Sequence, residues 1–122
     1  MASLFIVENN DLLRITYKKA LKIYGHKIIG DAANGNDAIL RYKNFSEKPD
    51  VILLDHRMSI KNGIEVMKEI LEIDNSAKCI FVSADIHIRE EVLKLGAVSF
   101  KEKPFSFERL HKNIKKALIL SN

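Results

Sequence analysis

Five residues whose side chains could share one chemical task follow short apolar segments of this chain. They are Glu8, Asn9, Asp55, Ser83 and Lys103. Clustered acids repel one another and invite a hard dication held by oxygen, namely Mg²⁺. An aspartate beside such an ion can attack phosphorus, a lysine can balance the remaining negative charge, and a hydroxyl can hydrogen-bond an attached phosphoryl group. These residue types are therefore the ones that phosphoryl transfer to a carboxylate needs.

The segments that must position these side chains alternate between strand and helix. Apolar runs predict strands at 4–7, 27–32, 51–54, 78–82 and 97–101. Apolar spacing predicts a helix after each strand: from a cap at Asn10 or Asp11 to Gly25, at 36–43, from Gly63, at 86–95, and after a cap at Ser106. This alternation implies an α/β fold with a five-stranded parallel sheet covered on both faces. Because ligands bind beyond the carboxyl ends of such strands, we expect the five side chains to share one rim.

The size and composition of the chain favour one globular domain over 1–122. The chain has 122 residues, of which 47% are hydrophobic and 30% are charged. No apolar run approaches the ~20 residues of a membrane-spanning helix, and the apolar stretch at the N-terminus is too short for a signal peptide. We therefore expect a cytoplasmic protein without a membrane segment.

The net charge of +4 raises the question of nucleic-acid binding. The densest basic group is Arg109, Lys112, Lys115 and Lys116. No aromatic residues interleave with these charges as a stacking platform would require. We interpret the group as the solvated face of an amphipathic helix and expect no direct contact with nucleic acid.

The cysteine and histidine residues do not form a metal-binding pattern. Cys79 is the single cysteine, which excludes an internal disulfide, and its apolar surroundings indicate a buried hydrophobic residue. The histidines lack ligand spacing and are expected to be at the surface or partly buried: His26, His56, His87 and His111.

Five short segments, in this order and each after its strand, resemble the receiver domain of two-component response regulators. They are Phe5-Ile6-Val7-Glu8-Asn9, Ile52-Leu53-Leu54-Asp55-His56-Arg57-Met58, Asn62-Gly63, Phe81-Val82-Ser83-Ala84 and Lys103-Pro104-Phe105. The resemblance covers the whole chain. It implies a flavodoxin-like, doubly wound (βα)5 sandwich with strand order 2-1-3-4-5.

The resemblance also implies a phosphoacceptor and a metal site. Asp55 matches the aspartate that accepts the phosphoryl group. Glu8 and Asn9 fall where the family has an acidic pair that holds Mg²⁺. Arg57 falls where a backbone carbonyl completes the metal ligands, together with Asp55 itself.

A switch and a lysine complete the roles that the resemblance implies. Ser83 matches the switch hydroxyl, and Phe100 matches the aromatic residue that turns inward when that hydroxyl moves. Lys103 matches the lysine of the site, and its bond to Pro104 is typically cis in the family. The fourth helix, fifth strand and fifth helix form the family's partner surface, through which a homodimer could also form.

Asn9 is the main departure from the family pattern, which has a carboxylate at this position. An amide oxygen can still bind Mg²⁺ but contributes no charge, so we expect affinity to fall roughly tenfold. Ser59 replaces a proline that the family usually has, which predicts a less rigid loop after Asp55.

Three functions compete at this stage. The leading hypothesis is a non-enzymatic switch that receives a phosphoryl group from a sensor histidine kinase at Asp55 and changes its affinity for a downstream protein or an output domain. The alternative is a pseudo-receiver, an interaction module that does not use phosphorylation, for which Asn9 is the best support. A flavin carrier or a small phosphatase is disfavoured, because the acidic loop after the first strand would repel a flavin phosphate and lacks the Asp-x-Asp of the phosphatase.

Overall fold

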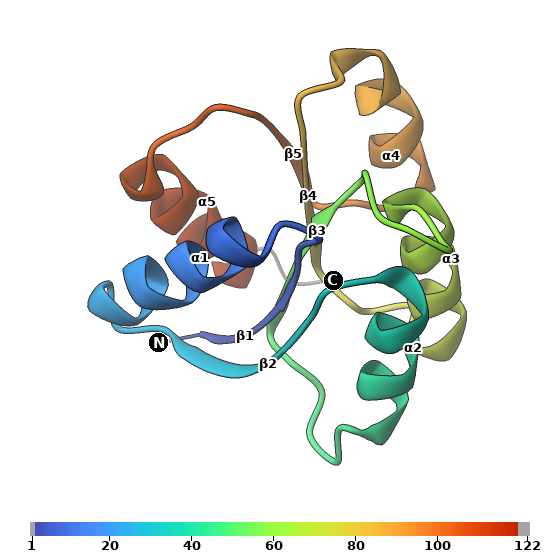
Figure 1. Ribbon diagram of the computed structural model, residues 1–122, viewed down its shortest axis with the longest axis horizontal. Coiled ribbons are helices and arrows are strands. Elements are labelled where there is room, and N and C mark those ends of the chain that lie inside the picture. The colour runs from blue at the N-terminus through green and yellow to red at the C-terminus, as the bar shows by residue number, and fades with distance from the viewer. Residues whose placement is uncertain (1, 120–122) are drawn as a thin grey trace.

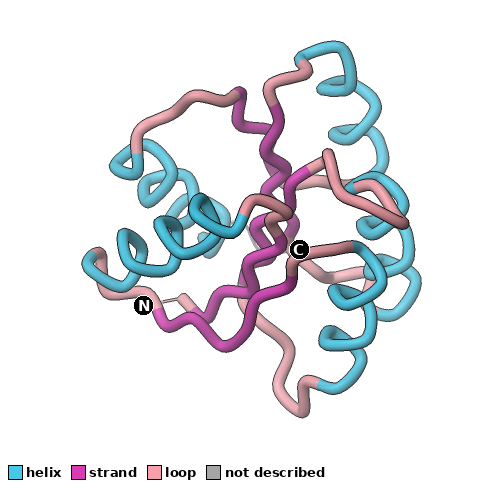
Figure 2. The backbone as a smooth tube through the Cα atoms, viewed as in Figure 1, coloured by secondary structure: helices cyan, strands magenta, loops and turns pink. Residues whose placement is uncertain are grey.

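A five-stranded parallel sheet forms the centre of the computed structural model, which describes residues 2–119. Its strands are β1 (Ser3–Val7), β2 (Lys27–Ala32), β3 (Val51–Asp55), β4 (Cys79–Ser83) and β5 (Ser99–Glu102). They lie in the order β2-β1-β3-β4-β5, which confirms the predicted fold class and strand order. Figure 2 shows the strands in magenta running through the centre of the domain, with helices to either side. Of the predicted domain 1–122, Met1 and residues 120–122 lie outside the described residues.

Helices cover both faces of this sheet. They are α1 (Asp11–Ile23), α2 (Gly35–Asn44), α3 (Gly63–Ile73), α4 (Arg89–Leu95) and α5 (Phe107–Ile119), with a short 3-10 turn η1 (Ile86–Ile88) before α4. Figure 1 shows α1 and α5 on one face and α2, α3 and α4 on the other. No helix between residues 2 and 119 is both long enough and apolar enough to cross a membrane.

The strands divide the core into two halves because successive side chains point to opposite faces. Leu4 and Ile6 of β1 belong to the cluster beneath α1 and α5, whereas Phe5 and Val7 belong to the cluster beneath α2, α3 and α4. All four side chains are buried. A strand buried on both faces reads as a continuous apolar run, which is why β1, β3 and β4 were recognisable in the sequence.

Three helices begin at asparagine caps. The side-chain oxygens of Asn10, Asn34 and Asn62 each accept a hydrogen bond from the backbone N–H three residues later. Each bond satisfies a donor that has no partner inside the helix. Between the two caps that the sequence allowed for the first helix, the structure has Asn10 rather than Asp11.

Two boundaries differ from the sequence prediction by more than one residue. The helix predicted at 86–95 is split, because the Asp85 side chain accepts from the N–H of His87 and closes a separate 3-10 turn. The last strand begins at Ser99 rather than at 97, because the Ala97 N–H donates to Val92 of α4 at 3.0 Å and still belongs to the turn that ends that helix. Gly96 makes this turn with a φ of 121°.

Candidate functional site

Two buried carboxylates lie side by side at the carboxyl ends of β1 and β3. In the parallel register Val7 is opposite Leu54, so the next pair along the two strands is Glu8 and Asp55. The exposed fractions of these two residues are only 2% and 6%. Like charges so close and so poorly hydrated require a cation near them.

Lys103 supplies that cation from the segment that directly follows β5, the edge strand of the sheet. Its ammonium nitrogen lies 3.0 Å from Oε1 of Glu8 and 3.1 Å from Oδ1 of Asp55. The backbone positions it, since the Lys103 N–H donates to the Ser83 carbonyl at 2.9 Å. The bond to Pro104 is cis. Three strands that are far apart in the sequence thus bring one lysine onto two acids, as the sequence predicted for a shared rim.

This arrangement shifts the pKa of the Asp55 carboxyl. Burial raises its pKa above the ordinary value, and the neighbouring charge of Glu8 raises it further. The attraction and hydrogen bond of Lys103 oppose this increase. Because burial and the Glu8 charge outweigh Lys103, the pKa of Asp55 stays raised, and a further cation beside the two acids would lower it.

We expect Asp55→Asn to unfold less readily than the wild type at neutral pH. A carboxyl whose pKa is raised in the folded state stabilises the fold below its unfolded pKa of about 3.9 and loses that contribution as pH rises through the folded pKa. Asparagine does not titrate, so the free energy of unfolding of the variant should exceed that of the wild type by about 1 kcal/mol near neutral pH. The two values should be equal near pH 3.5. Urea unfolding of both proteins at the two pH values measures the difference. A variant less stable than the wild type at neutral pH would contradict this expectation.

Gly63 packs its backbone directly behind Asp55. A Cβ atom at this position would collide with the Asp55 carbonyl oxygen and would lie 2.8 Å from both the His56 Cα and the Phe81 ring. The Gly63 N–H also donates to the His56 carbonyl at 2.8 Å, which closes the loop between β3 and α3. The sequence identified Gly63 as the start of a helix, whereas the close approach to the site appears only in the structure.

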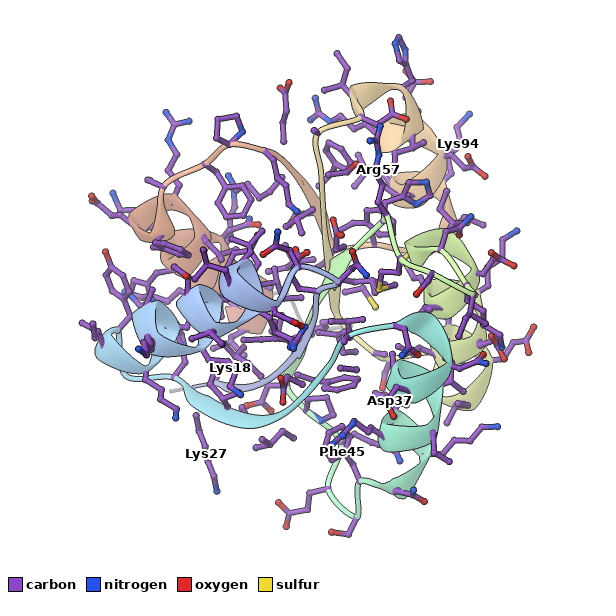
Figure 3. All side chains as sticks on the ribbon, viewed as in Figure 1. Lys18, Lys27, Asp37, Phe45, Arg57 and Lys94 are labelled. Carbon is purple, nitrogen blue, oxygen red and sulfur yellow. The ribbon has the colours of Figure 1, made fainter. Side chains whose placement is uncertain are left out.

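The two other predicted metal ligands, Asn9 and the carbonyl of Arg57, belong to the loops that leave β1 and β3. Asn9 follows Glu8 and is exposed, and Arg57 is exposed on the loop that leaves β3 (Figure 3). Two adjacent buried carboxylates with unbalanced charge fit a divalent cation, and an amide and a carbonyl oxygen are acceptable further ligands. Among residues 2–119, no three acid, histidine or cysteine side chains gather as a metal cluster. The residue after Glu8 is an asparagine and not an acid.

The predicted switch residues lie on the neighbouring strands β4 and β5. Ser83 is 2% exposed, and its hydroxyl accepts a hydrogen bond from the Asp85 N–H at 3.0 Å. Phe100 is half-buried, and its ring stacks on Phe81 with centroids 6.4 Å apart. Because β3 pairs with β4 and β4 with β5, Ser83 lies at the strand end between Asp55 and the segment that carries Lys103.

Arg14 also supports the site, although sequence reasoning did not identify it. Its guanidinium donates to the Glu8 carbonyl at 2.8 Å and binds the carboxylates of Asp11 and Asp31. These contacts fix the loop after β1 against α1 and β2. The spacing of Asp11 and Arg14 was a visible signal for the local ion pair, but the contact with Glu8 depends on how the loop folds back.

Fold and site together define a class of protein, a doubly wound α/β domain with a lysine-bridged acidic site at the carboxyl rim of its sheet. The family model for the response regulator receiver domain matches residues 4–115. The chain therefore belongs to the response regulator receiver domain family.

Individual relatives agree with this assignment. The chemotaxis protein CheY of Thermotoga maritima is 36% identical over 107 residues, which cover 86% of this chain and 88% of that protein. The sporulation initiation phosphotransferase F of Bacillus subtilis is 29% identical over 121 residues, which cover 98% of this chain and 95% of that protein.

Solved structures agree as well. A chain of the CheX-CheY-BeF3-Mg²⁺ complex from Borrelia burgdorferi superposes with a TM-score of 0.92 at 26% identity, over 97% of this chain and 90% of that chain. The response regulator TrrA of Thermotoga maritima, solved in complex with Mg²⁺ and BeF, has a TM-score of 0.86 at 30% identity, over 97% of this chain and 100% of that chain. Receiver domains of this family thus bind Mg²⁺.

Proposed function

We propose that this receiver domain accepts a phosphoryl group on Asp55 from the phosphohistidine of a sensor kinase and thereby changes its affinity for a protein partner. The observation that carries this proposal is the contact of Lys103 with both Asp55 and Glu8 across three strands. A lysine held on the acceptor aspartate is what transfer to a carboxylate requires, because it balances charge on the incoming group. On this proposal the domain is a switch and not an enzyme acting on other molecules.

The chemistry of the step assigns a task to each side chain. A carboxylate oxygen of Asp55 forms the new bond to phosphorus while the bond from phosphorus to the donor imidazole breaks, and the imidazole nitrogen keeps the electron pair. Lys103 stays within reach of the acceptor and neutralises a phosphoryl oxygen. Glu8, Asn9, Asp55 and the Arg57 carbonyl would hold Mg²⁺, which when bound offsets the negative charge of donor and acceptor.

The attached phosphoryl group would act on Ser83 and Phe100. It adds a charge of about −1.5 to −2 with strong acceptor oxygens, and the Ser83 hydroxyl can donate to one of them. Phe100 lines a cavity of about 660 Å³ between η1, α4, β5 and the start of α5. An inward turn of its ring would reshape this cavity, which supports the α4–β5–α5 face as the surface for a downstream protein, an output domain or a second copy.

Asn9 predicts weak magnesium binding, so we expect Asn9→Asp to bind Mg²⁺ roughly tenfold more tightly. The physical reason is one additional negative charge beside a dication. Calorimetric titration with Mg²⁺ measures the effect. Asn10→Asp is the matched control, because it adds the same charge one residue later on a side chain that already caps α1. Equal gains in both variants would mean that general charge, and not ligation by residue 9, sets the affinity.

Intact-mass measurement after incubation with acetyl phosphate across a series of Mg²⁺ concentrations tests the proposed function. We expect the wild type to gain one phosphoryl group with increasing Mg²⁺, and Asp55→Asn to gain none because an amide oxygen is a poor nucleophile. The second arm measures transfer from a phosphorylated histidine kinase domain, because a protein donor presents the phosphoryl group in a geometry that acetyl phosphate does not reproduce. No gain in either arm would reject the proposal and favour the pseudo-receiver.

A further inference from the structure

Two histidine side chains meet at the end of the domain opposite to Asp55. His26 directly precedes β2, and His111 lies in the first half of α5. Nε2 of His26 is 2.8 Å from Nδ1 of His111, which is a hydrogen bond between the rings. His26 is only 4% exposed, so the expectation that it is at the surface or partly buried was wrong. Nothing in the proposed phosphoryl transfer uses this pair.

The end of α1 brings His26 to this place. Gly25 adopts a φ of 91°, and the His26 N–H donates back to the Leu21 carbonyl at 3.1 Å, which turns the chain sharply after the helix. The ring of Tyr24 then stacks on His111, with centroids 4.5 Å apart and planes 18° from parallel. One hydrogen bond and one ring stack therefore join α5 to the corner between α1 and β2. They add to the apolar packing of Leu110, Ile114 and Ala117 in the core beneath α1.

The hydrogen bonds leave no place for an additional proton. The Ala2 N–H donates to Nδ1 of His26 at 3.4 Å, so this nitrogen is an acceptor and the hydrogen of His26 is on Nε2. A pair that gained a proton and kept its 2.8 Å bond would have to carry that proton on Nδ1 of His26, facing the Ala2 N–H. Protonation therefore costs one of the two bonds.

The surroundings also disfavour a positive charge. Burial lowers the pKa of His26, and repulsion from His111 and from the α-amino group lowers it further. The acids on the elements around the pair are Asp11 on α1, Asp31 on β2, Glu108 on α5 and Asp50 before β3, and the bases are Arg14, Lys18, Lys19 and Lys22 on α1, Lys27 on β2, and Arg109, Lys112, Lys115 and Lys116 on α5. Glu108, one turn before His111, is bound to Lys112 at 3.2 Å. The Asp50 carboxylate is bound to the Ser3 N–H at 2.9 Å, and Lys27 extends away from the sheet (Figure 3). Among the described hydrogen bonds, neither ring has a carboxylate partner that would stabilise an imidazolium.

We infer that His26 and His111 form a proton-sensitive latch that tightens the packing of α5 on the α1–β2 corner at neutral pH and loosens it on mild acidification. The sign follows from linkage. A histidine that is harder to protonate in the folded state contributes its full stability above its unfolded pKa of about 6.5 and loses it as pH falls below that value. Because α5 borders the cavity beside Phe100 through Arg109, this loosening would alter that face without involving Asp55.

Hydrogen exchange of the full chain at about pH 7.5 and pH 5.5, corrected for the intrinsic exchange rate, tests the latch directly. We expect the α5 amides of the wild type to lose protection at the lower pH before the α3 amides do. His87→Gln is the matched control, because His87 is exposed and its ring is in no described hydrogen bond. This variant should behave as the wild type does. Unchanged α5 protection in the wild type would overturn the inference.

A double-mutant cycle gives a second, independent readout. His111→Phe keeps a ring against Tyr24 but removes the acceptor, and His26→Gln removes the titrating ring. Relative to His26→Gln, the unfolding equilibrium constant of the wild type should rise by up to about tenfold between pH 7.5 and pH 5.5. The coupling free energy between positions 26 and 111 should decrease as the pH falls from 7.5 to 5.5. Equal coupling at both pH values would also overturn the latch.

Discussion

Lys103→Met is expected to reduce the rate of phosphoryl incorporation by about 100-fold or more, the usual cost of removing one preorganised charged donor. The variant keeps an apolar side chain of similar length but removes the ammonium from Asp55 and Glu8. Intact mass as a function of time, with acetyl phosphate and saturating Mg²⁺, measures the rate.

The same substitution should destabilise the fold at neutral pH by about 3 kcal/mol, since it leaves two buried acids without their cation. The loss should shrink near pH 4, where the raised pKa of Asp55 allows this carboxyl to be neutral. Lys101→Met is the matched control, because it removes a lysine from β5 itself. A Lys103→Met protein that is phosphorylated at the wild-type rate would show that the contact is structural and not part of the transfer.

Gly63→Ala is expected to destabilise the protein by about 3 kcal/mol, at the upper end of the cost of overpacking, because the obstacle is backbone. The added methyl group would press on the Asp55 carbonyl and on the loop closed by the hydrogen bond from Gly63 to His56. Displacement of the acceptor by about 1 Å should also slow phosphorylation by roughly 100-fold. Urea unfolding and the mass assay measure the two effects.

Gly30→Ala separates a site effect from a general glycine effect. A Cβ atom at Gly30 would meet the end of the Phe45 ring at 2.8 Å, a side chain that can move, on the edge strand β2 away from Asp55. We expect a smaller loss of stability and an unchanged phosphorylation rate. Similar rates for Gly63→Ala and wild type would mean that the loop can shift without moving the acceptor.

The proposed acceptor site was largely visible in the sequence because each of its residues ends a strand or directly follows one. The apolar runs before Glu8, Asp55 and Ser83 are buried on both faces and stand out in composition. Parallel strands then place their carboxyl ends together whatever the loops do. The last strand was less well predicted, because hydrogen bonds of the turn after α4 moved its start to Ser99.

Other features could not be predicted because they depend on which backbone approaches which side chain. Nothing local marks Gly63 as the residue behind Asp55, or Arg14 as the support of the Glu8 carbonyl. His26 and His111 are 85 residues apart and have no ligand-like spacing, so their contact exists only through the packing of α5 on α1.

By itself, the sequence determined the order of the elements, the parallel sheet and the identity of the acids, hydroxyl and lysine at its rim. These depend on periodicity and on residue type, which are local properties. Tertiary structure alone decided that Lys103 bridges Glu8 and Asp55, that the Asp55 carboxyl is buried enough for its pKa to rise, and that two histidines share a hydrogen bond. Distance, burial and the resulting electrostatic energies arise only when segments remote in the chain are packed together.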